Sequence, residues 1–222
     1  MLFRSKVKAP AAETSRDRVL SDDELRLLWQ GAEAIGWPFG PIVQLLILTG
    51  QRRAEVAGMR WAEVDLANRI WTIPAARCKN DIEHRVPLSN QMIAILESLP
   101  RIAGSDLIIS YTGRSPFDGF GPAKVRLDAA IAVKSGAPVP DWRLHDLRRT
   151  FATGCARLGV QLSVVEKLLN HTGGSFRGVA GVYQRFDFAS EERAAVETWA
   201  RHVEAIVSGE TAANVVSMKA KA

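Results

Sequence analysis

The chain has 222 residues, a hydrophobic fraction of 47% and a formal net charge of +5, from 29 lysines and arginines against 24 acidic residues. This length allows one large domain or two small ones, and the apolar content is sufficient for a buried core. The small charge excess is compatible with a polyanionic partner but does not identify one. Cys78 and Cys155 are the only cysteines, which argues against a disulfide framework and fits a reducing cytoplasm.

The longest apolar run, PIVQLLILTG, is too short to span a bilayer, and the N-terminus lacks an apolar stretch long enough for a secretory signal. We therefore expect a cytoplasmic protein that makes no membrane contact. Residues 1–18 are rich in basic and small residues and are expected to be a disordered linker. Residues 208–222 are expected to form a flexible tail.

Between these ends the first elements are two helices and a hairpin. SDDELRLLWQGAEAIG begins with Ser21 and has Glu24 three residues later, which is the pattern of a capping box. PIVQLLILTG begins with proline and ends at Gly50, as a buried helix does. The β-branched runs RIWTIP and EHRVPL flank the polar stretch AARCKNDI and predict a small β-hairpin with an extended turn.

The second half of the chain is predicted to be helical, apart from a loop at GRSPFDGFGP. The expected helices cover residues 89–98, 121–134, 144–158, 161–169 and 189–207. One face of the last helix carries Ala195, Trp199, Val203 and Ile206. The fold class is therefore mainly α with a small antiparallel β-sheet (α+β), in one domain over residues 19–207.

The helix that begins WRLHDLRRTF has an apolar face, yet its first turn is crowded with polar groups. Residues three or four apart share a helix face, so His145 can lie beside Arg148 or Arg149, and spacing does not decide which. A guanidinium there is suited to binding two oxygens of a phosphate, and an imidazole can hold or move a proton. A solvated capping cluster would have the same sequence.

A second basic pair, Arg52 and Arg53, follows the glycine that ends the buried helix. Glu55 lies three residues past Arg52 and has the spacing to brace its guanidinium. An ordinary surface ion pair would have this spacing too.

Three further residues are candidates on the same grounds. Lys79 lies near the tip of the predicted hairpin, where its flexible stem can carry a donor into a site or simply face water. His171 follows a helix, and a glycine-rich link separates it from Tyr183. A lone tyrosine near a chain end usually has a packing role.

Other polar and aromatic residues receive structural interpretations. His84 is expected to face solvent or DNA backbone, and His202 to lie at the surface, whereas the tryptophans are expected to pack: Trp61, Trp71 and Trp142. Neither cysteine has a partner at metal-ligand spacing, so we predict no metal site. Sequence-independent phosphate contacts are plausible for Arg53, Arg60, Lys124, Arg126, Arg143 and Arg149.

In chain order, the candidates are Thr49-Gly50-Gln51-Arg52 with Glu55, Lys79, His145 with Arg148, LLNH ending at His171, and Tyr183. This order resembles the catalytic domain of the tyrosine recombinases, the phage and genomic-island integrases. Their pattern is T-G-x-R-x-x-E, a hairpin lysine, H-x-x-R, L-x-H and a tyrosine after a glycine-containing stretch. The resemblance spans roughly residues 18 to 207 and selects Arg52 over Arg53 and Arg148 over Arg149.

The resemblance implies a site-specific recombinase that integrates or excises a mobile element through a 3′-phosphotyrosyl intermediate on Tyr183. Arg52 and Arg148 are implied to bind the non-bridging phosphate oxygens, with Glu55 orienting them. Double-stranded DNA is the implied partner, and no cofactor or metal is needed. The family's separate N-terminal core-binding domain is absent from this chain, so we expect a truncated or excised catalytic domain.

The resemblance also implies the proton chemistry and the assembly. His145 is implied to accept or relay the tyrosine proton, Lys79 to protonate the leaving 5′ oxygen, and His171 to donate a further hydrogen bond. We expect a monomer when the protein is free and a homotetramer on synapsed DNA, with a nucleoid-associated location. An excisionase or a host DNA-bending protein is a further partner that the resemblance suggests. Two alternatives stay open: a type IB topoisomerase-like relaxing enzyme and a catalytically silent DNA-binding relic.

Overall fold

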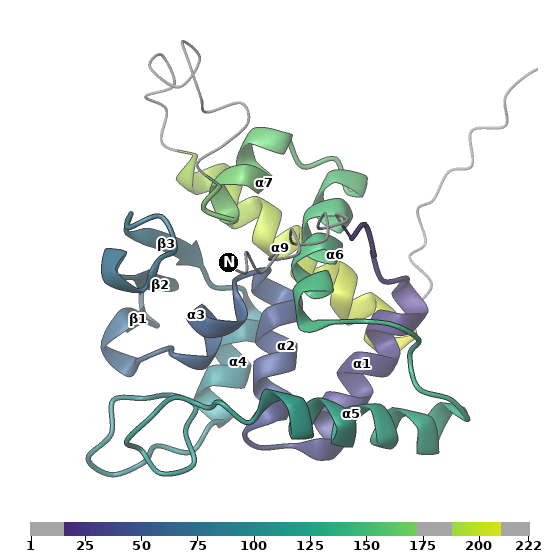
Figure 1. Ribbon diagram of the computed structural model, residues 1–222. Helices are drawn as coiled ribbons and strands as arrows, with labels where there is room; N and C mark the ends of the chain where they lie inside the picture. The colour runs from purple at the N-terminus through teal and green to yellow at the C-terminus, as the bar shows by residue number, and fades with distance from the viewer. Residues whose placement is uncertain (1–15, 172–187, 210–222) are drawn as a thin grey trace, which may run out of the picture.

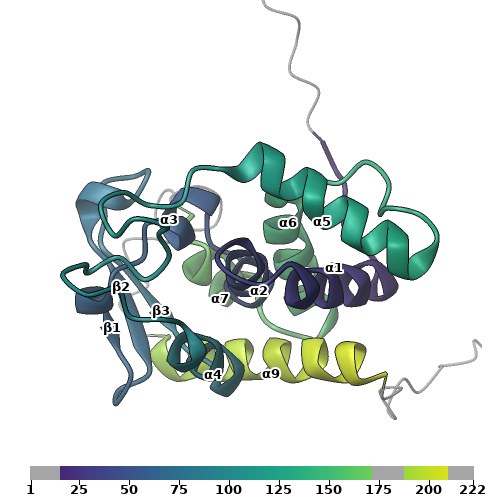
Figure 2. The same ribbon diagram turned by 90° about the horizontal axis from the view of Figure 1, so that it is seen from below.

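The computed structural model describes residues 16–171 and 188–209, and these form a body of helices with a small sheet on one flank (Figure 1). At its centre is α2 (Phe39–Thr49), in which all residues except Pro41 and Gln44 are buried. A helix that is apolar all round needs neighbours on every side. Seen from below, α2 is surrounded by the other helices (Figure 2).

The helices that surround α2 begin and end close to the predicted positions. Their bounds are α1 (Asp22–Ile35), α4 (Asn90–Ser98), α5 (Phe120–Ser135), α6 (Leu144–Arg157), α7 (Leu162–Leu168) and α9 (Ala189–Ser208). The capping box of α1 is confirmed, because Ser21 accepts from the Glu24 backbone N–H and Glu24 accepts from that of Ser21. In the part of the chain that the structure describes, no helix is both long and apolar enough to cross a membrane.

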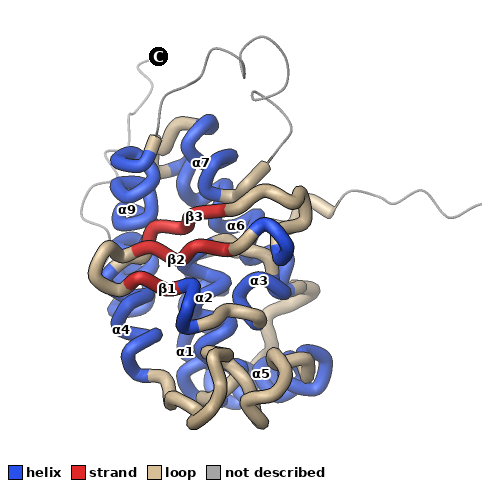
Figure 3. The backbone as a smooth tube through the Cα atoms, turned by 90° about the vertical axis from the view of Figure 1, so that its left-hand side faces the viewer, coloured by secondary structure: helices blue, strands red, loops and turns tan. Residues whose placement is uncertain are grey.

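The sheet has three antiparallel strands in the order β1-β2-β3 (Figure 3). The predicted hairpin is confirmed as β2 (Ile70–Ile73) and β3 (His84–Pro87), with Ile73 opposite His84. The strand β1 (Val64–Asp65) and the helix α3 (Arg53–Ala57) were not predicted, because such short elements do not establish a hydrophobic period. Two short 3₁₀ turns, Trp61–Glu63 and Ala75–Arg77, complete the region.

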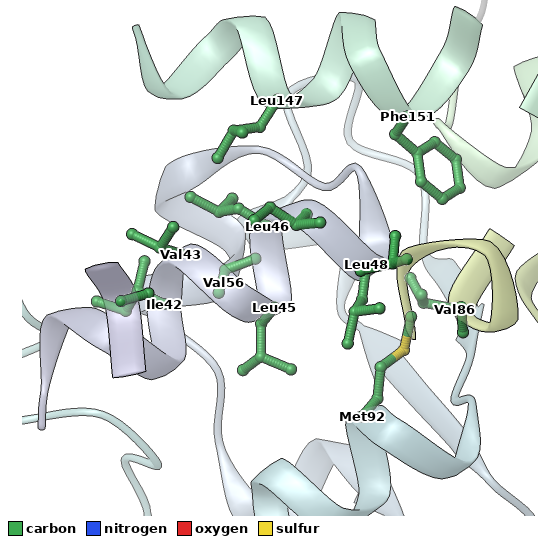
Figure 4. Close-up of a cluster of buried hydrophobic side chains, with 14 of the residues drawn as sticks. Ile42, Val43, Leu45, Leu46, Leu48, Val56, Val86, Met92, Leu147 and Phe151 are labelled. Atoms are coloured by element: carbon green, nitrogen blue, oxygen red, sulfur yellow. The ribbon is translucent and has the colours of Figure 1, made fainter. Parts of the chain in front are cut away.

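One hydrophobic cluster joins these elements, with side chains from α2, β3, α4 and α6 meeting in its middle (Figure 4). Trp71 and Trp142 are buried in it as predicted, and Trp61 packs against it while remaining partly exposed. The predicted apolar face of α9 is confirmed: Ala195, Trp199, Val203 and Ile206 are all buried.

One of the contacts that hold the helix α9 against the centre of the molecule is made by an indole. Trp199 Nε1 donates to the carbonyl oxygen of Ile47 at 2.8 Å. Its ring lies directly against Gly154 of α6, where an added Cβ would come within 2.1 Å of Trp199 Cζ3. The glycine therefore allows α6 and α9 to approach closely.

Residues 16–18, which the sequence assigned to the linker, lie against the start of α6. Arg16 contacts Asp141 at 3.0 Å and Asp146 at 3.2 Å. Just after them, the Leu20 N–H donates to Thr150 Oγ1 at 2.9 Å. These contacts attach the entry into the domain to the helix that carries His145.

Candidate active site

The turn after α2 positions the first arginine. Gly50 ends α2 with a φ of 63°, a left-handed conformation that glycine adopts without strain. An added Cβ would lie 2.6 Å from the ring of Phe151 on α6, so a glycine is also needed for the close approach of the two segments. The chain then turns into α3, with Arg52 at its N-cap position.

The Arg52 side chain is held in place by the carboxylate of Glu55. This carboxylate accepts from Arg52 Nη1 at 2.8 Å and from the Arg52 backbone N–H at 2.8 Å. The Glu55 side chain is 3% exposed, whereas that of Arg52 is 25% exposed. A charge-assisted bond to a buried, fixed carboxylate restricts the guanidinium while leaving part of it accessible.

The second arginine, Arg148 on α6, is buried among main-chain acceptors. Its guanidinium donates to the carbonyl oxygen of Gly50 at 2.9 Å and to that of Leu169. Burial lowers the pKa of Arg148 to about 10, and the positive charge of Arg52 acts in the same direction. Arg148 therefore stays positive at neutral pH, within electrostatic reach of Arg52.

The two arginines that follow His145 on α6, Arg148 and Arg149, have different hydrogen-bond partners. Arg149, the alternative, donates instead to Asp146 Oδ1 at 3.0 Å. Asp146 is fully buried and also accepts from the Arg143 backbone N–H at 2.8 Å, which caps α6. Arg149 thus supports the start of the helix, while Arg148 turns toward Arg52.

The two histidines lie next to this pair. Burial lowers the pKa of His145, and the positive charges of Arg149 and Arg148 lower it further. Burial likewise lowers the pKa of His171, followed by the charges of Arg148 and Arg52. At neutral pH each imidazole is therefore mainly neutral and can accept a proton at one ring nitrogen while donating from the other.

A cleft of about 620 Å³ opens beside these groups. The turn after α2, the start of α3, the β2–β3 turn, and the starts of α5 and α6 line it, and they contribute Arg52, Lys79 and His145. Its wall also carries three of the residues that were expected to contact phosphates: Arg53, Lys124 and Arg143. A concave surface with this density of positive charge is suited to a polyanion.

The structure thus brings five predicted residues and their supporting carboxylate into one region: Arg52, Lys79, His145, Arg148, His171 and Glu55. The sixth, Tyr183, lies outside the residues that the structure describes. Among the other basic candidates, Arg60 pairs loosely with Asp106, at 3.9 Å, and does not line the cleft.

The prediction for His84 was wrong. Its side chain is buried, and Nε2 lies 3.0 Å from the carbonyl oxygen of Leu168. Burial lowers its pKa to about 4. A signal was present in the sequence, because His84, Val86 and Leu88 alternate along one face of a strand and two of the three are apolar.

His202 also differs from the surface position that was expected. It is partly buried, 5.6 Å from the ring of Trp199 between centroids, and its Nε2 lies 3.7 Å from Asp22 Oδ1. Sequence reasoning also missed Gln51, whose Nε2 donates to the carbonyl oxygen of Leu168 at 2.7 Å. Gln51 occupies the variable position of the T-G-x-R segment, so the motif itself does not point to it.

The fold and this site define a mainly α domain with a small sheet, in which two arginines lie within electrostatic reach of each other beside a basic cleft. Residues 18–179 match the phage integrase family, and the chain belongs to that family. The resemblance to tyrosine recombinases is therefore confirmed.

Similar proteins include two curated integrases. Prophage integrase IntA of Escherichia coli (strain K12) is 33% identical over 166 residues, which are 75% of this chain and 38% of IntA. The integrase of Salmonella phage P22 is 24% identical over 168 residues, or 73% of this chain and 43% of that protein. The chain thus spans about two fifths of the length of these relatives.

Two solved structures share the fold. XerA recombinase superposes with a TM-score of 0.57 and 23% identity, covering 88% of this chain and 66% of XerA. A lambda integrase dimer bound to a COC′ core site gives a TM-score of 0.56 and 21% identity, covering 75% of this chain and 62% of that one. The predicted α+β fold class is confirmed.

Proposed function

We propose that this chain cuts and rejoins double-stranded DNA at specific sites, through a covalent 3′-phosphotyrosyl intermediate on Tyr183. The observation that carries the proposal is the convergence of Arg52 and Arg148. Arg148 donates to the carbonyl oxygen of Gly50, which lies 98 positions away along the chain and two residues before Arg52. The positive charge of Arg52 also lowers the pKa of Arg148, so the two guanidinium groups interact electrostatically. Membership of the phage integrase family supports the same function.

The two arginines suit the charge of the reaction. A phosphodiester repels nucleophiles through its negative charge, and this charge grows on the non-bridging oxygens as phosphorus becomes pentacoordinate. Arg52 and Arg148 would each hold one of these oxygens, already oriented by Glu55 and by main-chain carbonyls. Because the donors are fixed before DNA binds, little reorganisation opposes the transition state.

Proton transfer would be divided between His145 and Lys79. A phenol has a pKa of about 10, so Tyr183 must lose its proton as its oxygen bonds to phosphorus. Neutral His145 accepts or relays this proton, while Lys79 gives one to the 5′ oxygen as the P–O5′ bond breaks. His171 adds a hydrogen bond to the phosphate. The tyrosyl ester keeps the bond energy, so a different 5′ hydroxyl can rejoin the strand without ATP.

In this proposal residues 19–207 form the catalytic domain, with residues 1–18 as linker and residues 208–222 as tail. The partner is double-stranded DNA, by analogy with the lambda integrase dimer bound to its core site. The positive cleft supports it. We further propose a tetramer on synapsed DNA, a nucleoid location, and assistance by an excisionase or a host DNA-bending protein.

A nicked suicide substrate tests the proposal, because the short 5′ fragment diffuses away and traps the covalent complex. Tyr183→Phe should abolish the trapped complex and leave DNA affinity nearly unchanged. The matched control is Tyr111→Phe, which alters the only other tyrosine of the chain. Tyr111 is 63% exposed, in the loop before α5. Loss of the complex in the control, or its persistence in Tyr183→Phe, would contradict the assignment.

Two other functions would give different results in the same preparation. A type IB topoisomerase-like enzyme would relax plasmids that lack any recombination site. A silent DNA-binding relic would bind the substrate and form no covalent complex with it. The grouping of Lys79 and both histidines around the arginines favours the recombinase over the relic, since binding alone requires no proton donor.

A further inference from the structure

The C-terminal end of α7 is fastened by side chains from three other elements. The carbonyl oxygen of Leu168 accepts from Gln51 Nε2 at 2.7 Å and lies 3.0 Å from His84 Nε2. The carbonyl oxygen of Leu169 accepts from Arg148. The last carbonyl groups of a helix lack intrahelical partners, so these contacts satisfy them and fix where the chain leaves α7.

The residue that follows this anchored end is bonded to the hairpin. Asn80 Nδ2 donates to Asn170 Oδ1 at 2.8 Å, and Asn170 Nδ2 donates back to Asn80 Oδ1 at 3.2 Å. Asn170 also reaches the carbonyl oxygen of Ile82 at 3.4 Å. Its φ of 49° is left-handed, a conformation that asparagine tolerates better than most residues.

Each member of this amide pair is the direct chain neighbour of a proposed site residue. Lys79 precedes Asn80, and His171 follows Asn170. Lys79 lies in the link between β2 and β3, which is long enough to move unless it is tied down. Arg77 ties its first half to Glu63 at 2.9 Å, and Asn80 ties its second half to the end of α7. Figure 3 shows β3 passing beside α7.

We propose that the Asn80–Asn170 pair is a positioning device that sets Lys79 relative to His171. This inference rests on the proposed function, because it concerns how Lys79 delivers the proton to the leaving group. With the pair intact, the proton donor of the hairpin and the phosphate ligand of the α7 end move as one unit. Without it, Lys79 reaches the leaving oxygen in only a fraction of encounters, and a misplacement of about 1 Å can cost roughly 100-fold in rate.

The experiment compares two suicide substrates that differ at the leaving atom. One carries the normal 5′ oxygen, and the other a 5′-bridging sulfur, which leaves as a thiolate and needs no acid. The proteins are the wild type, Lys79→Ala, Asn80→Ala, Asn170→Gly and the Asn80→Ala/Asn170→Gly double variant. Glycine accepts the left-handed backbone at position 170, so this variant removes the side-chain bonds to Asn80 and Ile82 without straining the backbone.

On the oxygen substrate, Asn80→Ala and Asn170→Gly should each form the covalent complex about 10- to 100-fold more slowly. The double variant should be no slower than the worse single variant, because both remove the same pair. On the sulfur substrate, Asn80→Ala should return to the wild-type rate. A structural defect unrelated to Lys79 would lower the rate of covalent-complex formation equally on both substrates.

The matched control is Asn68→Ala, which removes another side-chain amide bond of the sheet, from Asn68 Nδ2 to Asp65 Oδ2 at 2.7 Å. It should cleave both substrates at the wild-type rate. If Asn80→Ala unfolds, Asn80→Leu keeps nearly the size and shape of the side chain and removes the amide without adding a charge. Circular dichroism and thermal melts establish which variants are folded.

The failure of this inference is distinguishable from the failure of the proposed function. The positioning role alone would be overturned if the sulfur substrate rescued Lys79→Ala but not Asn80→Ala. It would also be overturned if Asn80→Ala cleaved the oxygen substrate at the wild-type rate. Lack of rescue of Lys79→Ala would remove lysine from the acid role. Absence of any covalent complex with the wild type would overturn the proposed function and this inference with it.

Discussion

Replacing His84 with glutamine is expected to remove a large part of the acid sensitivity of this fold. His84 is 7% exposed, and its Nε2 lies 3.0 Å from the carbonyl oxygen of Leu168. Burial is the main cause that lowers its pKa to about 4, and the charges of Arg148 and Arg52 act in the same direction. The Leu168 carbonyl and Glu55 oppose the shift without reversing it.

The sign follows from where the proton binds. In the unfolded chain His84 is protonated below its ordinary pKa of 6.5, whereas in the folded protein it is protonated only below about 4. The unfolded state therefore binds more protons in this window, and the stability present above pH 6.5 is lost as the pH falls toward 4. The full difference corresponds to roughly 3 kcal/mol, of which about 2 kcal/mol falls between pH 7 and pH 5.

Urea unfolding at pH 7 and pH 5 measures this loss in the wild type and in His84→Gln. Glutamine places an amide donor at a similar distance from the Leu168 carbonyl and does not take up a proton. At pH 7 the variant should lose about 1 kcal/mol, as for an imperfect hydrogen bond. Between the two pH values the wild type should lose about 2 kcal/mol more than the variant. Equal losses would refute the burial argument and restore the solvent-facing interpretation of His84.

Three further predictions concern other parts of the molecule. Gly154→Ala should lower the free energy of unfolding by about 1–3 kcal/mol, because the new Cβ would meet an indole on α9. Gly121→Ala, at an open helix position, should be neutral or stabilising in the same thermal melts. Asp146→Ala should cost about 2–3 kcal/mol in urea unfolding, because it removes a buried acceptor of several donors. Asp141→Asn, at an exposed position whose positive φ asparagine also tolerates, should cost less than about 1 kcal/mol. Glu55→Gln should slow covalent-complex formation about 10-fold with unchanged DNA affinity by fluorescence anisotropy, and an equal loss of affinity would contradict its orienting role.

Local sequence patterns were sufficient for most of the secondary structure. Helix periodicity, the Ser21–Glu24 capping box and the β-branched runs each depend on contacts within a few residues, and all of them are confirmed. The short elements α3 and β1 were not predicted, because they contain too few residues to establish a hydrophobic period. The order of the motifs also separated Arg148 from Arg149, but only through resemblance to a family.

Packing between distant segments decided what local patterns could not. His84 is buried because the end of α7 lies over β3, 84 positions away along the chain. Asn80 meets Asn170 across 90 positions, and Arg148 reaches Gly50 across 98. Helical spacing specifies which residues share a face, but not which surface that face will meet. That choice depends on how the helices around α2 exclude water together, so the site exists only once the core has formed.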